Sequence, residues 1–285
     1  MDADVPLAEI DARVAKERCA KALSKYLRTE EPVSLEKTCF EIIKILPGRS
    51  DAPPQESVER TAMWHVFVDA AEMIPYNHPF QAKLVRLAAA LRYSPKTGQA
   101  LRWVSPLRDE GLDEPAKLER ARRWVNINAF YANMYHFGWY AHPDYCHEVL
   151  DLAFGSSHRA DAAWHDAHVC AAAQWIIYSG QSMSQEVLNP SEFQELGDRP
   201  LRLSLAHWRY CKEGFRGAGN DIERPDETRF LAARAANLMD CLEENMLPVL
   251  GQSVGPPDTV EERFLARMRN MEYDGTKPDE IGRRF

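Results

Sequence analysis

Two histidines and an aspartate lie in the middle of the chain at spacings that suit a shared helix face. Asp161, His165 and His168 follow one another at steps of four and three residues. On a helix, residues three or four positions apart are neighbours on the surface. Because imidazole is the usual general acid or base near neutral pH, these three side chains are the candidate catalytic residues.

The same three side chains have a second chemical interpretation, as metal ligands. Two histidines with one carboxylate are a known ligand set for iron or zinc, but the spacing is not that of an H-E-x-x-H motif. A metal site would need a further ligand from another helix: His136, His142, His147 or His207. The simpler interpretation is that His165 pairs with Asp161 and that His168 is a hydrogen-bonded core histidine. We therefore expect no metal and no cofactor.

Aromatic side chains are dense on both sides of these histidines. Aromatic walls with a few polar tips are typical of small-molecule pockets, and they are equally typical of helical cores. The segment before the histidines also alternates asparagines with aromatics, and buried amides must bond either to neighbouring groups or to a ligand. The candidate ligand-binding residues are Asn133, His136, Trp139, Trp164, Trp175, Tyr178, His207 and Trp208.

A central helix is predicted over residues 156–180, and its first half carries the histidines. Ser156 and Ser157 suit a helix start, and Gly180 suits a left-handed end. Polar residues become scarce after His168, so the second half of this helix is expected to be buried on most sides.

Hydrophobic periodicity between proline and glycine signals predicts the remaining helices. They cover residues 7–27, 34–46, 55–74, 80–91, 113–137, 144–154, 201–215, 228–247 and 259–271. The glycines from Gly214 to Gly219 are interpreted as a helix end and turn, and Pro248 as the end of the next helix. No series of strands appears. The sequence therefore predicts an all-α bundle or irregular array with about ten helices, as a single domain over residues 1–272 with a polar tail at 273–285.

Charge and composition exclude several classes of protein. The net charge of −8 and the pI near 5.7 argue against a nucleic-acid binder. The amino-terminal residues lack an apolar signal segment, and the longest strongly apolar run is too short to cross a bilayer. Six cysteines are scattered singly, which favours reduced, mostly buried thiols over disulfides. We expect a cytoplasmic protein that contacts neither nucleic acid nor membrane.

Several packing motifs resemble those of one known family. They are the run from Ala172 to Ile176 with Gly180 after it, Trp208 with Phe215, and the alanine-rich helix from Ala232 to Met239. The pattern resembles a fungal, all-helical family known only as a domain of unknown function, best over the second half of the chain. This resemblance implies a cytosolic fungal origin and an association with secondary-metabolism or self-recognition genes. It supplies no catalytic residues.

Two functions remain after these exclusions. The first is binding or transformation of an apolar small molecule of specialised metabolism in an aromatic-lined pocket between helices. The second is a non-enzymatic helical module for protein–protein interaction, which would present an exposed apolar groove instead. Self-association is compatible with either function.

Overall fold

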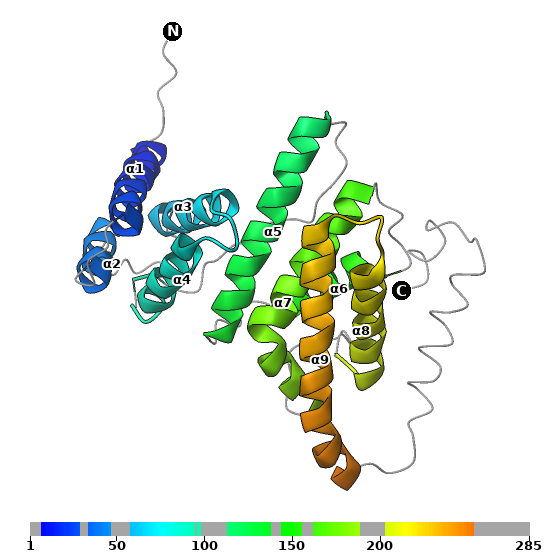
Figure 1. The fold of residues 1–285 in the computed structure, drawn as a ribbon. Helices are drawn as coiled ribbons and strands as arrows, with labels where there is room; N and C mark the ends of the chain where they lie inside the picture. Colours follow the sequence, from blue (N-terminus) through cyan, green and yellow to red (C-terminus); the bar gives the residue numbers. More distant parts are fainter. Residues whose placement is uncertain are drawn as a thin grey trace, which may run out of the picture. The chain divides into compact units, whose positions relative to one another are not determined.

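The computed structural model describes residues 7–28, 34–46, 58–94, 96–97, 113–137, 144–155, 162–188 and 203–253. Within these ranges the chain forms nine α-helices and no strand, which confirms the predicted all-α class (Figure 1). The helix predicted at 259–271 and the tail at 273–285 lie outside the described residues.

The chain divides into two compact units, Met1–Ala141 and His142–Phe285. Each unit has its own buried aromatic and aliphatic side chains, so each is described by itself. The single domain expected over residues 1–272 stays a prediction.

The described part of the first unit contains five helices. They are α1 (Leu7–Arg28), α2 (Ser34–Ile45), α3 (Val58–Met73), α4 (Pro79–Leu91) and α5 (Glu114–His136). Helix α3 packs on both α1 and α5, and Trp64, Phe67, Trp124 and Phe130 are fully buried within the unit. Burial of these large rings supplies hydrophobic stabilisation to the unit.

Helix α5 begins where its capping signals predict. The Asp113 carboxylate accepts a hydrogen bond from the Ala116 backbone N–H at 3.0 Å, and a proline occupies the first turn. Inside the helix, the Asn126 side chain accepts from the Tyr76 N–H and donates to the Glu72 carbonyl, at 2.9 and 2.8 Å. This amide thereby ties the connection between α3 and α4 to α5.

The described part of the second unit contains four helices. They are α6 (Asp144–Phe154), α7 (Ala162–Leu188), α8 (Leu205–Asn220) and α9 (Asp226–Ser253). Helix α7 packs against α6 and α9, and α8 packs along α9. The most buried large side chains include Trp175, Trp208 and Phe215. No helix in the described part of the chain is both long and apolar enough to span a membrane.

Gly180 does not end the central helix, so that prediction is wrong. Helix α7 continues to Leu188, and Gly180 lies inside it against α9. A Cβ atom at position 180 would come 3.1 Å from Cδ1 of Leu242. The glycine therefore allows two helices to approach closely, which is a different reason for glycine than helix termination.

Two other predicted helix ends are also wrong. Helix α8 runs through Gly214 and Gly217 to Asn220, and a Cβ atom at Gly219 would lie 3.1 Å from the backbone nitrogen of Ala233. Helix α9 likewise continues past Pro248 to Ser253. The start of α8 is also later than predicted, because Ser204 caps it by accepting from the His207 N–H at 3.0 Å.

Candidate functional site

A cavity of about 260 Å³ lies between α6, α7 and α8 in the second unit. It is lined by Ala153, Phe154, Gly155, His165, Tyr210, Glu213 and Gly214. His165 is the one candidate catalytic residue among these seven. The cavity combines aromatic rings with a carboxylate, which is the usual composition of a small-molecule site.

Two side chains of the cavity bind the carbonyl end of α6. The last carbonyls of a helix have no partner inside the helix and need one from elsewhere. The carbonyl oxygen of Phe154 accepts a hydrogen bond from the Tyr210 hydroxyl at 2.5 Å. The carbonyl oxygen of Ala153 lies 3.0 Å from Nε2 of His165. Helices α7 and α8 thus fix the end of α6, which is one wall of the cavity.

The proton position on His165 follows from its second partner. Nη2 of Arg224 lies 3.0 Å from Nδ1 of His165, and a guanidinium can only donate. Nδ1 is therefore the acceptor, and Nε2 carries the hydrogen that is donated to Ala153. Arg224 is held in turn by the carboxylates of Asp166 at 2.7 Å and Asp221 at 3.2 Å. As a general base, His165 would first have to release Arg224.

The ring of Phe154 fits in its position because residue 214 is a glycine and has no side chain. A Cβ atom at position 214 would overlap this ring, whereas one at Gly217, one turn further along α8, would meet nothing within 4 Å. Phe154 also packs edge-on against Phe215, with ring centroids 4.6 Å apart. Gly214 therefore sets the position of the aromatic wall.

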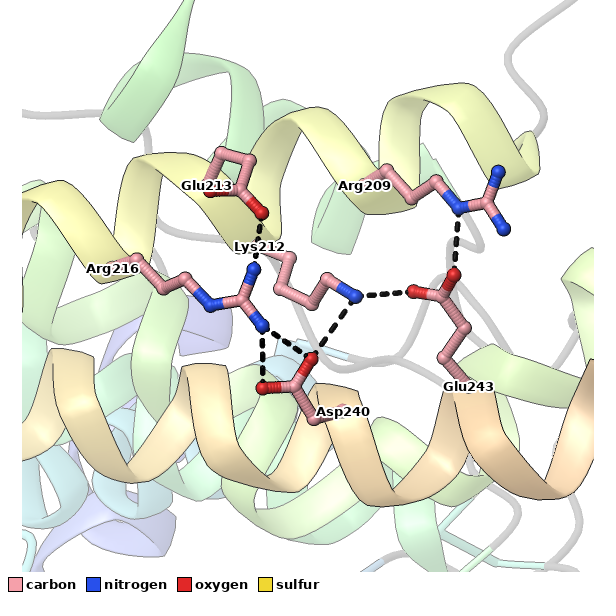
Figure 2. A network of polar contacts seen from close by, with 6 residues as sticks. All are labelled: Arg209, Lys212, Glu213, Arg216, Asp240 and Glu243. Atoms are coloured by element: carbon pink, nitrogen blue, oxygen red, sulfur yellow. Dashed lines mark hydrogen bonds and ion pairs between the residues drawn. The ribbon is translucent and has the colours of Figure 1, made fainter.

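A network of charged side chains joins α8 to α9 next to the cavity (Figure 2). Lys212 contacts both Asp240, at 3.1 Å, and Glu243, at 2.5 Å. Arg216 donates from Nη2 to both carboxylate oxygens of Asp240 and from Nη1 to Glu213. Glu213 therefore connects the cavity to this network.

The carboxylates of the network are stabilised in their charged forms. Burial raises the pKa of Asp240, but hydrogen bonds from Arg216 and Lys212 outweigh it and lower the pKa below its ordinary value of 3.8. Burial also raises the pKa of Glu243, and hydrogen bonds from Lys212 and Arg209 likewise bring it below 4.5. Both acids are ionised at neutral pH as a result.

A second polar pair is buried between α6 and α7. Nε2 of His147 lies 3.3 Å from Oε2 of Glu186, and the two residues are only 3% and 8% exposed. Burial lowers the pKa of His147, but its hydrogen bonds and charge interactions with Cys146 and Glu186 raise it by more, so the net direction is upward. His147, which the sequence offered as a metal ligand, has a structural partner here.

The other predicted site residues are distributed over both units. Asp161 and Trp139 lie outside the described residues. Trp164, Trp175 and Trp208 are buried in the second unit with His168, and Tyr178 is half-buried there. Nε2 of His207 lies 3.1 Å from Oδ1 of Asp151. Asn133 and His136 belong to the first unit. Ligand contact by these residues stays a prediction.

Two of the three asparagines of α5, Asn128 and Asn133, have backbone partners within their own helix. The side-chain amide of Asn133 donates to the Ala129 carbonyl at 2.8 Å, and that of Asn128 donates to the Trp124 carbonyl at 2.9 Å. This is the first of the two interpretations that the sequence left open. Among the described residues, no group of three or more His, Cys, Asp or Glu side chains is placed to hold a metal ion.

The prediction that most cysteines are buried is confirmed. All six cysteines are free, and Cys19, Cys146, Cys170 and Cys211 are buried. Burial raises the pKa of the Cys170 thiol to about 12, although a hydrogen bond to Thr228 opposes the shift. A neutral buried thiol of this kind is a poor nucleophile.

Sequence reasoning missed Tyr210, Glu213 and Gly214. Their spacing of three and four residues along α8 places them on one helix face, and this was the signal that could have found them. The predicted turn at residues 214–219 is inconsistent with such a face, because a turn does not keep helical spacing.

A sequence model described as "Protein of unknown function (DUF3632)" matches residues 64–224, which is more than half of the chain. The chain belongs to the DUF3632 family. The match runs from α3 to the turn after α8, so it includes all seven residues of the cavity. The helix at 232–239, on which the expected resemblance also depended, lies beyond it. No curated protein and no solved structure matches the chain.

Proposed function

We propose that this protein binds a small molecule and that the cavity between α6, α7 and α8 is its binding site. The observation that carries the proposal is the cavity itself, whose polar and aromatic side chains are already fixed by contacts with one another and with the backbone. Pre-organised sites of this kind lose little conformational entropy when a ligand binds.

The volume of the cavity limits the size of the ligand. Ligand pockets usually enclose about 300–1,000 Å³, and the cavity here holds about 260 Å³. A ligand built on a single ring fits this space better than a multi-ring apolar product. The proposal assigns binding and no reaction, because the nitrogens of His165 are both engaged in hydrogen bonds with Ala153 and Arg224.

Native mass spectrometry with a mixture of single-ring fragments tests this proposal. Gly214→Ala would displace the Phe154 ring that lines the cavity, and Gly217→Ala is the matched control on the same helix. We expect fragment adducts on the wild type and on Gly217→Ala, and their loss on Gly214→Ala. Equal adducts on all three proteins, or adducts on none, would contradict the assignment of this cavity.

A second candidate function is interaction with another copy of the chain. Two large apolar side chains of the second unit are strongly exposed, Ile222 at 83% and Phe230 at 65%. Large apolar side chains that stay exposed can form part of a contact surface. Sedimentation velocity over a range of concentrations tests it: self-association of the wild type that Phe230→Ser abolishes would support this candidate, and a wild-type monomer at every concentration would exclude it.

A further inference from the structure

We infer that the cavity between α6, α7 and α8 selects a small organic cation, namely a protonated amine on a ring-sized body. This inference depends on the proposed function, because it concerns the ligand of the same site. Two observations support it. The hydrogen-bond donors that line the cavity already bond to the protein, and the charged side chain that lines it is a carboxylate.

The hydrogen-bond donors at the wall are directed at the protein itself. The Tyr210 hydroxyl donates to the Phe154 carbonyl, and the Nε2–H of His165 donates to the Ala153 carbonyl. The backbone N–H of Gly155 is also used, because it bonds to the Asp151 carbonyl at 2.7 Å. A ligand that needs donors from the protein, such as a carboxylate or phosphate, finds them committed elsewhere.

Acceptors remain at the same wall. A carbonyl oxygen has two lone pairs and a carboxylate has about four acceptor positions, so one hydrogen bond does not saturate either group. Glu213 is the one formally charged side chain among the seven lining residues. Its contact with Arg216 is through Oε1, and Arg216 also holds both carboxylate oxygens of Asp240 (Figure 2). A carboxylate whose cation is shared with a second acid can accept further hydrogen bonds from an ammonium group.

The rings at the wall favour the same ligand. Phe154 and Tyr210 both line the cavity, and the face of an aromatic ring attracts a cation within about 6 Å. A ring-bearing amine can therefore contact an aromatic wall with its body and donate to Glu213 with its ammonium group.

Three probes of similar size and different charge test the inference. Benzylammonium, benzyl alcohol and benzoate would be titrated into the full chain at neutral pH and followed by NMR chemical shifts. We expect the wild type to bind benzylammonium about two- to fivefold more tightly than benzyl alcohol, since the Glu213 side chain is 63% exposed and an exposed ion pair contributes modestly. Glu213→Gln should remove this preference and leave benzyl alcohol unaffected.

The controls separate the ligand class from the site. Glu148→Gln removes an exposed charge from α6 without touching the cavity, so it should keep the preference for benzylammonium. Benzyl alcohol or benzoate could instead bind as tightly as the amine, with Gly214→Ala abolishing that binding. The inference of a cationic ligand would then be wrong, while the cavity would still be the binding site. If binding of every probe is absent, or survives Gly214→Ala, both the inference and the proposed function are wrong.

Discussion

The hydroxyl of Tyr210 on α8 donates its hydrogen to the carbonyl oxygen of Phe154, the last residue of α6, across 2.5 Å. The two residues are 56 positions apart in the sequence. This bond satisfies a carbonyl that α6 leaves unpaired and also fixes an aromatic wall of the cavity. One hydrogen bond thereby serves both the stability of the second unit and the shape of its site.

Tyr210→Phe should lower the free energy of unfolding by about 1 kcal/mol. The ring keeps its packing, while the Phe154 carbonyl loses its donor, and water entering the cavity replaces it only in part. Urea unfolding followed by tryptophan fluorescence measures the change. Tyr93→Phe is the control, because that hydroxyl accepts a hydrogen bond from Arg92 on the exposed surface. Equal effects of the two substitutions would contradict this role for Tyr210.

Lys212→Met should be the most destabilising change in the charged network, by about 3 kcal/mol. Lys212 is nearly buried and lies between Asp240 and Glu243, so its loss leaves two carboxylates facing each other. Arg209→Met removes a half-exposed partner of Glu243 and should cost less than about 1 kcal/mol. Adding Glu243→Gln to Lys212→Met should recover part of the loss in urea unfolding. A double variant less stable than Lys212→Met would argue against this account.

The network should make stability depend on acid pH. The pKa values of Asp240 and Glu243 are depressed in the folded chain, so their contribution is fully present above the ordinary values of 3.8 and 4.5. It is lost as the pH falls through the lower folded values. The free energy of unfolding should therefore decrease below about pH 5 more steeply in the wild type than in Asp240→Asn. Parallel pH profiles of the two proteins would exclude the effect.

Two glycines of α8 should respond in opposite directions to alanine. Gly217→Ala adds a methyl group in open space and removes backbone freedom from the unfolded chain, which should stabilise by about 0.5–1 kcal/mol. Gly219→Ala brings its methyl group within 3.1–3.2 Å of the backbone and Cβ of Ala233, so α9 must shift. We expect a loss of about 1 kcal/mol at Gly219. Thermal unfolding of the two variants and the wild type measures whether the melting temperature rises for Gly217→Ala and falls for Gly219→Ala.

Periodicity and capping residues predicted most helix positions. The predicted and observed bounds of α6 are the same, because Pro143 and Gly155 flank it, and those of α4 differ by one residue at its start, where Pro79 lies. The wrongly predicted helix ends lie at Gly180, at the glycines of α8 and at Pro248, where the helices continue. A glycine marks either a helix end or a close helix contact, and only the position of a neighbouring helix distinguishes the two.

The candidate site was predictable only in part for a related reason. The sequence indicates His165 because it lies three residues before another histidine. Its partner Arg224 is 59 positions away, and the spacing of residues in the sequence does not predict a contact over that separation. The residue type alone makes the tryptophans candidate ligand contacts. Trp175 and Trp208 are fully buried in the core of the second unit.

The most direct test of the proposed site is a crystal structure of the full chain soaked with benzylammonium. The account predicts density for the ring against Phe154 and Tyr210, with the ammonium nitrogen within hydrogen-bonding distance of a Glu213 oxygen. Ordered ligand at another place, with this cavity empty, would contradict the assignment of the site.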